Sequence, residues 1–181
     1  MTSAAPESTN TALSVPVALM LLVVAVAALG GFIALATFLS LTPLYAAFLL
    51  LWYWAGIDKF DFRAAPATII GALAGVGTAW LLQIAVHAND PVMIGGVLVL
   101  ILVALFLQMV NWVPMLVNSA YMLFLTIACA PLLQAGEDYS RVMIAMLIGC
   151  AYFGGLVFIG QRIMSGRAKV SEPATGAQPV A

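Results

Sequence analysis

The chain has 181 residues, of which 65% are hydrophobic and only 7% are charged, and its formal net charge is −1. Because soluble domains carry about a quarter charged residues, this composition excludes an ordinary soluble fold and indicates an all-α membrane protein. The near-zero net charge gives no basic face for nucleic acid, which excludes that class of partner.

The first apolar stretch, residues 13–56, contains no charged residue. As one helix it would be about 66 Å long, twice a hydrocarbon core of about 30 Å, so it must fold back on itself. The pair Gly30-Gly31 is the natural turn, because glycine permits left-handed backbone geometry. The second helix of this hairpin then carries Pro43 near its middle.

A charged loop at 57–63 precedes a third apolar stretch, and Asp90-Pro91 begins a fourth. An aspartate accepts the free N–H groups of a first turn, where proline is tolerated. Residues 91–135 are again long enough for two crossings, with the break at 111–114. The six predicted transmembrane helices cover residues 13–30, 32–56, 64–87, 91 to about 110, 114–133 and 142–161.

These helices predict one transmembrane domain over 13–163, flanked by disordered segments at 1–12 and 164–181, with no cleaved signal peptide. Lysine and arginine collect on the cytoplasmic side of a membrane. Six crossings place most cations on the side of both termini, which predicts that both ends of the chain are cytoplasmic. The cations on that side are Lys59, Arg63, Arg162, Arg167 and Lys169, against Arg141 alone on the other.

The two halves of the chain share one plan, a long uncharged hairpin, a short charged loop and one further span. A shift of 80 positions lays Gly30-Gly31 over Val110-Asn111 and residues 55–58 over 135–138. Three spans per half is an odd number, so related halves would be inverted, with a substrate site at their interface. The few identities leave chance similarity open as the alternative.

No Asp, Glu, Lys or Arg lies inside a predicted span. Ion pumps and proton-coupled carriers generally need an ionisable group at membrane depth, so a facilitator for an uncharged solute fits better. A polar set around the second break predicts substrate or pore contacts, although such groups more often only fix helix packing. This set consists of Gln108, Asn111, Asn118, Ser119, Tyr121 and Thr126.

Prolines and small residues mark further positions. Pro43, Pro114 and Pro131 predict helix breaks, which either flank a binding site or act as simple kinks. Small residues predict close helix contacts within a subunit or in a homo-oligomer. The positions singled out for packing are Gly71, Gly75, Gly149 and Gly154.

Enzymatic chemistry is not indicated. The two cysteines, Cys129 and Cys150, have no ligand spacing, and no catalytic constellation lies at membrane depth. His87 is the single histidine and is expected to be a solvated helix-end residue. We therefore expect no metal and no cofactor.

The run Val-Pro-Met-Leu-Val-Asn-Ser-Ala-Tyr-Met-Leu-Phe from position 113, with residues 145–149 and Phe153-Gly154, resembles the domain of unknown function 1097 family of small bacterial inner-membrane proteins. In that family a Val-Pro step, a small-residue helix, a Phe-Ala pair and a Gly-rich last span follow in this order. Leu125 stands in place of the alanine. The resemblance covers about residues 45–160 and implies membrane location and a compact multi-span fold, without an activity.

The sequence thus favours a homo-oligomeric membrane channel or facilitator for a small neutral solute, surrounded by membrane lipids. The alternative is a non-transporting membrane scaffold or an accessory subunit of a larger membrane complex.

Overall fold

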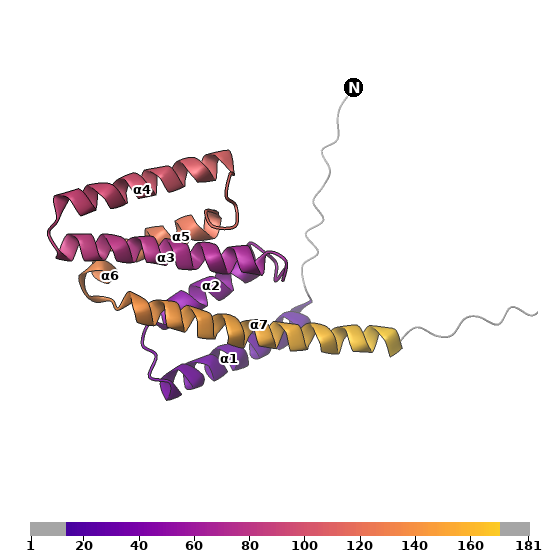
Figure 1. Cartoon of the computed structure of the whole chain (residues 1–181). Coiled ribbons are helices and arrows are strands. Elements are labelled where there is room, and N and C mark those ends of the chain that lie inside the picture. The colour runs from indigo at the N-terminus through magenta and orange to yellow at the C-terminus, as the bar shows by residue number, and fades with distance from the viewer. Residues whose placement is uncertain (1–13, 171–181) are drawn as a thin grey trace, which may run out of the picture.

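The computed structural model describes residues 14–170, with side chains described through residue 163. This part of the chain is all-helical and contains no strand. Its helices are α1 (Val15–Phe38), α2 (Leu44–Gly56), α3 (Ala65–His87), α4 (Pro91–Val110), α5 (Ser119–Ala128), α6 (Pro131–Gly136) and α7 (Tyr139–Val170) (Figure 1). The predicted helical fold class is therefore confirmed.

Four of these helices, α1, α3, α4 and α7, are long and apolar enough to cross a membrane. The helix α2 has 13 residues and α5 has 10. At about 1.5 Å per residue they are roughly 20 Å and 15 Å long, shorter than a hydrocarbon core of about 30 Å. Two of the six predicted helices are thus too short to span alone.

The predicted turn at Gly30-Gly31 is wrong, because α1 continues through both glycines to Phe38. Gly31 serves a close contact instead: a Cβ added there would lie 2.3 Å from the Tyr152 hydroxyl oxygen. The chain turns nine residues after Gly31, where Ser40 has a left-handed φ of 54°. Pro43, which lacks an N–H, directly precedes α2 rather than lying within it.

The second break lies where it was predicted, since α4 ends at Val110 and Asn111 caps it with a left-handed φ of 52°. However, α5 begins at Ser119 and not at Pro114. Pro131 was expected in the last turns of this helix, but it begins the separate helix α6. Proline is favoured in a first turn, where its missing N–H has no helical partner to lose.

The predictions for α3 and the start of α4 are confirmed. Asp90 caps α4 by accepting from Val92 N–H at 2.9 Å and from Met93 N–H at 3.2 Å. The last helix begins at residue 139 rather than 142 and continues to 170, so residues 164–170 of the expected disordered tail are helical. The rest of that tail, 171–181, and the N-terminal segment 1–12 lie outside the described residues.

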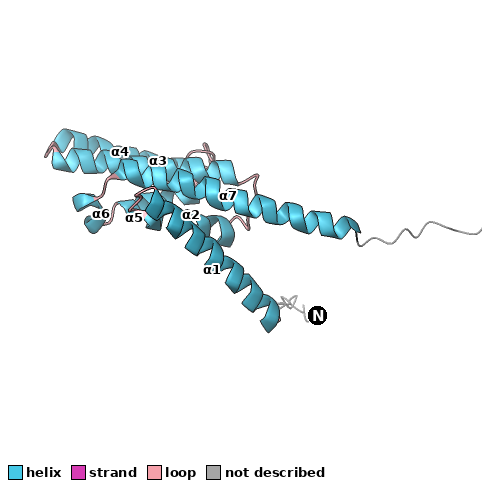
Figure 2. Ribbon diagram, turned by 90° about the horizontal axis from the view of Figure 1, so that it is seen from below, coloured by secondary structure: helices cyan, strands magenta, loops and turns pink. Residues whose placement is uncertain are grey.

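Two helix pairs form the centre of the molecule, α3 with α5 and α2 with α7, and α3 contacts α7 between them. The helix α4 packs on the outside of α3, and α1 packs on α7 (Figure 1). The main core consists mostly of side chains from α2, α3, α5 and α7, with Ala104 from α4 and Val117 from the segment before α5. Residues 15–27 of α1 are all exposed, and Figure 2 shows this end of α1 diverging from the other helices.

Candidate functional site

Asn118, the strongest candidate in the predicted polar set, uses its side-chain amide for hydrogen bonds that hold helices together. Its Oδ1 accepts from Tyr121 N–H at 3.0 Å, which caps α5. Its Nδ2 donates to Ala67 O at 2.8 Å and to Pro114 O at 3.1 Å. The amide fills the space beside Gly71, where an added Cβ would lie 2.2 Å from Oδ1. Asn118 therefore joins α5 to α3.

The other predicted polar residues do not gather around a shared path. The Tyr121 hydroxyl is buried 3.0 Å from the Thr78 hydroxyl. Thr126 is exposed and donates to Met122 O at 2.7 Å within its own helix. Of the remaining three, Ser119 and Asn111 are exposed, while Gln108 is half-buried and its Oε1 has no partner in the described part of the chain.

The glycines singled out for packing lie mostly inside the subunit. Gly71 and Gly75 face α5, and a Cβ at Gly75 would lie 2.4 Å from Tyr121 O. Gly149 faces α2, where an added Cβ would lie 2.6 Å from the Ala47 Cβ. Gly154 is different, because nothing lies within 4 Å of an added Cβ. These close approaches hold the two central helix pairs together.

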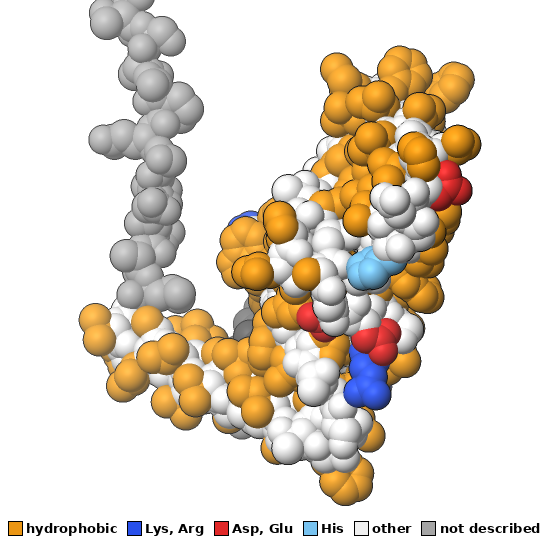
Figure 3. Space-filling model, turned by 90° about the vertical axis from the view of Figure 1, so that its left-hand side faces the viewer, with side chains coloured by type: hydrophobic (Ala, Val, Ile, Leu, Met, Phe, Trp, Pro, Cys, Tyr) orange, Lys and Arg blue, Asp and Glu red, His pale blue; other side chains and the backbone are white. Residues whose placement is uncertain are grey.

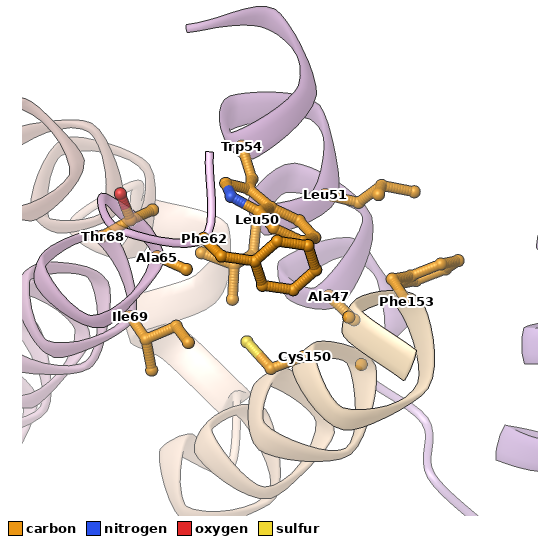
Figure 4. A pocket seen from close by; sticks show the side chains of 12 residues that line it. Ala47, Leu50, Leu51, Trp54, Phe62, Ala65, Thr68, Ile69, Cys150 and Phe153 are labelled. Carbon is orange, nitrogen blue, oxygen red and sulfur yellow. The ribbon is translucent and has the colours of Figure 1, made fainter. Parts of the chain in front are cut away.

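Gly154 faces a cavity of about 160 Å³ between α2, α3 and α7. The cavity is lined almost entirely by apolar atoms, and the Cys150 sulfur points towards its centre (Figure 4). None of the six predicted polar residues lines it. The lining residues are Ala47, Leu50, Leu51, Trp54, Phe62, Ala65, Thr68, Ile69, Gly149, Cys150, Phe153 and Gly154.

The loop between α2 and α3 covers one end of this cavity with aromatic side chains. The Trp54 ring meets the Phe60 ring at 5.3 Å and the Phe62 ring at 5.1 Å, both edge to face. Trp54 Nε1–H donates to Asp61 O at 3.0 Å. The Thr68 hydroxyl, which belongs to the cavity wall, donates to the Asp58 carboxylate in the same loop.

A second polar network, at the other end of the bundle, was missed by the sequence analysis. Gln134 Nε2 donates to Ala79 O and to Ala128 O, each at 3.0 Å, and joins α6 to α3 and α5. Gln83 Nε2 donates to Glu137 O at 3.0 Å, and the Tyr139 hydroxyl donates to Ala128 O. The only sequence signal was the presence of isolated amides in apolar stretches, which any packed membrane helix can show.

The face in Figure 3 carries the histidine and a few scattered acidic and basic side chains among apolar surface. His87 Nδ1 lies 2.8 Å from Gln83 O, so the ring bonds to the backbone of its own helix and not to a side chain. Arg141, in the first turn of α7, pairs at 3.4 Å with Asp138 of the loop before that helix. Across residues 14–163, no group of three His, Cys, Asp or Glu side chains is placed to hold a metal.

Comparison with protein-family models, with curated proteins and with solved structures finds no match for this sequence. The resemblance to the domain of unknown function 1097 family therefore stays a prediction.

Proposed function

We propose that the protein is a small membrane channel or facilitator for an uncharged, weakly polar solute, and that the cavity between α2, α3 and α7 is its binding site. The observation that carries the proposal is the lining of this cavity, which contains no charged side chain. Burying an ion there would be prohibitive, and each unpaired hydroxyl or amide would cost about 2–7 kcal/mol. The solute is therefore neutral and has few polar groups.

The volume of the cavity also limits the size of the solute. An engineered apolar cavity of about 150 Å³ in another protein holds benzene, and this cavity is of comparable size. The Thr68 hydroxyl and the Cys150 thiol supply its polar atoms. We propose these two residues as the solute contacts, in place of Asn118 and its neighbours, because the latter are bonded within the bundle or exposed.

The proposal includes six crossings, in which α2 makes one pass together with the turn residues 39–43 before it, and the broken pair α5–α6 makes another. Its support is that Asn118 lies beside Gly71 near one end of α3, whereas Gln134 bonds to Ala79 further along the same helix. The segment containing both thus advances along α3. Broken helices are tolerated at membrane depth where the protein covers their free backbone groups.

An inverted repeat of three plus three helices is part of this proposal, in a new register. Pro43 before α2 and Pro114 before α5 are 71 positions apart, as are Ala47 and Asn118. Ala47 lies against Gly149, and Asn118 lies against Gly71. The two glycines are 78 positions apart, so the second half would carry seven more residues between its two contact positions. With that insertion, the same helix-to-glycine contact occurs once in each central pair, which supports related halves.

The cytoplasmic location of both termini stays part of the proposal. Phe62, in the loop with Lys59 and Arg63, meets Phe158 of α7 at 6.2 Å, and Arg162 lies over the Phe158 ring at 5.1 Å. These cations therefore gather at one end, as the positive-inside rule requires for a cytoplasmic face. Membrane lipids would cover the outward faces of α1 and α4. A homo-oligomer would use such outer surfaces, since most of the predicted glycine contacts are internal.

Flux through liposomes tests the proposal. Vesicles with the full-length protein should swell faster than empty vesicles in at least one small neutral solute. Gly154→Leu should lower this rate at least tenfold, because the new side chain would occupy the cavity. Gly155→Leu is the matched control, since nothing lies within 4 Å of an added Cβ there and the residue does not line the cavity. Swelling equal to that of empty vesicles across a solute panel would remove the proposal.

A second candidate is a non-transporting scaffold or accessory subunit. It is favoured by the exposed end of α1, whose residues 15–27 contact no other helix closely enough to be covered. A membrane helix that stands apart in this way leaves room for a partner helix. This candidate predicts no solute-dependent swelling, and no difference between the Gly154 and Gly155 variants.

A further inference from the structure

We infer that the loop between α2 and α3 is a gate over one mouth of the cavity, opened when an occupant competes for the Thr68 hydroxyl. This inference rests on the proposed function. The gate consists of the aromatic cap, defined as Trp54, Phe60 and Phe62, and of the hydrogen bond between Asp58 and Thr68 that fastens it.

The cap extends across the mouth from one wall to the opposite wall. Trp54 belongs to α2, and both it and Phe62 line the cavity (Figure 4). Phe62 also meets Phe158 of α7 at 6.2 Å. The loop thus contacts both helices of the α2–α7 pair, and its aromatic rings close the space that a solute would have to pass.

The hydrogen bond that holds the cap in place involves Thr68, which also lines the cavity. Thr68 is 5% exposed and lines the cavity, while its hydroxyl donates to the half-buried Asp58 carboxylate. No ion pair involving Asp58 is present among the residues that the structure describes. A solute with an acceptor oxygen or nitrogen could take the Thr68 hydrogen bond, and Asp58 would then be free to return to water. Binding and opening are coupled because they compete for one donor.

The closed loop also stores backbone strain. Lys59 has a φ of 52° and Phe60 a φ of 60°, and both are non-glycine residues in the left-handed region. Such conformations are costly and persist where the surrounding contacts impose them. Here those contacts are the Asp58–Thr68 bond and the ring contacts of Phe60. Loss of either contact should favour the open loop.

Access to Cys150 measures the gate without any transport. We would place the full-length Cys129→Ser protein in lipid nanodiscs and add a small, neutral, hydroxyl-bearing methanethiosulfonate reagent, which partitions poorly into hydrocarbon but can enter an apolar cavity of this size. The cap should make labelling of Cys150 slow. Asp58→Ala should raise the rate about tenfold, the scale expected for losing a hydrogen bond to a charged group. Thr68→Val, which removes the donor for which an acceptor solute would compete, should also raise it.

The matched control is Asp138→Ala, which removes a loop carboxylate at the other end of the bundle and should leave the labelling rate unchanged. Trp54→Phe gives a second test, since it keeps an aromatic ring but loses the bond to Asp61 O, and it should also speed labelling. Equal rates in the parent, Asp58→Ala and Trp54→Phe proteins would overturn the gate. Faster labelling without solute flux would remove only the transport proposal, and flux with unchanged labelling would remove only the gate.

Discussion

The two central helix pairs are built on the same contact but differ in what fills it. In the α3–α5 pair, the Asn118 amide fills the space beside Gly71, and Tyr121 is hydrogen-bonded to Thr78. In the α2–α7 pair, the small Ala47 side chain lies against Gly149, and a cavity of about 160 Å³ is left beside it.

The difference separates the structural role of the α3–α5 pair from the solute-binding role that we propose for the α2–α7 pair. Polar side chains in a membrane must find partners, and in the α3–α5 pair Asn118 finds one in the backbone of α3 and Tyr121 finds one in the Thr78 side chain. That pair is consequently closed. The α2–α7 pair has few polar groups to fix its geometry, and its unfilled volume is where a solute can bind.

The largest effect expected from this comparison is at Gly75. A methyl group there would lie 2.4 Å from Tyr121 O and 3.0 Å from Leu125 N, both backbone atoms that cannot move independently. Gly75→Ala should destabilise the protein by about 3 kcal/mol, the upper range for overpacking. Gly154→Ala, on the cavity side, should change the free energy of unfolding little. Denaturation in detergent micelles compares the two variants. Equal losses of unfolding free energy would contradict the interpretation that the α3–α5 pair is tightly packed and the α2–α7 pair contains unfilled space.

The next effect is expected at Asn118. Asn118→Ala removes the cap of α5 and two hydrogen bonds to backbone carbonyls, for a loss of about 2 kcal/mol. Thr126→Ala is the control, because Thr126 is exposed and its hydroxyl bonds only to Met122 O within its own helix. Solute flux per folded molecule should remain unchanged in both variants. A large loss of flux by Asn118→Ala at full stability would restore Asn118 as a solute contact.

Local signals in the sequence were sufficient for some elements and not for others. The Asp90-Pro91 start of α4 was predictable because capping depends on neighbours within one turn. The prediction of a turn at Gly30-Gly31 was wrong because Gly31 leaves space for the Tyr152 hydroxyl, which is more than a hundred positions away in the sequence. The two central helix pairs likewise join segments that are distant in sequence. The polar set was identified, but which residues bond to backbone and which line the cavity depends on that pairing.

A smaller effect is expected from Tyr121→Phe, which removes only the hydroxyl that meets Thr78 across the closed pair. Interhelical hydrogen bonds in membrane proteins contribute about 0.6 kcal/mol on average. Thr78 retains its bond to Ala74 O at 2.9 Å, so no buried donor is left without a partner. We therefore expect a loss of about 0.6 kcal/mol in the same denaturation assay. Thr126→Val, at an exposed hydroxyl, should have no measurable effect.

The smallest effect is expected in the loop between α2 and α3, which covers the cavity of the α2–α7 pair. Lys59→Gly would relieve the left-handed strain at φ 52° while increasing the freedom of the unfolded loop. The net gain for the closed loop should be about 0.5 kcal/mol, which corresponds to about twofold slower labelling of Cys150. Asn89→Gly is the matched control, because Asn89 has a similar φ of 50° in the loop between α3 and α4, away from the cavity. If both variants slowed labelling equally, the effect would not be specific to the loop over the cavity, and the prediction would be contradicted. Slower labelling in Lys59→Gly alone would tie access to the cavity to the conformation of this one loop.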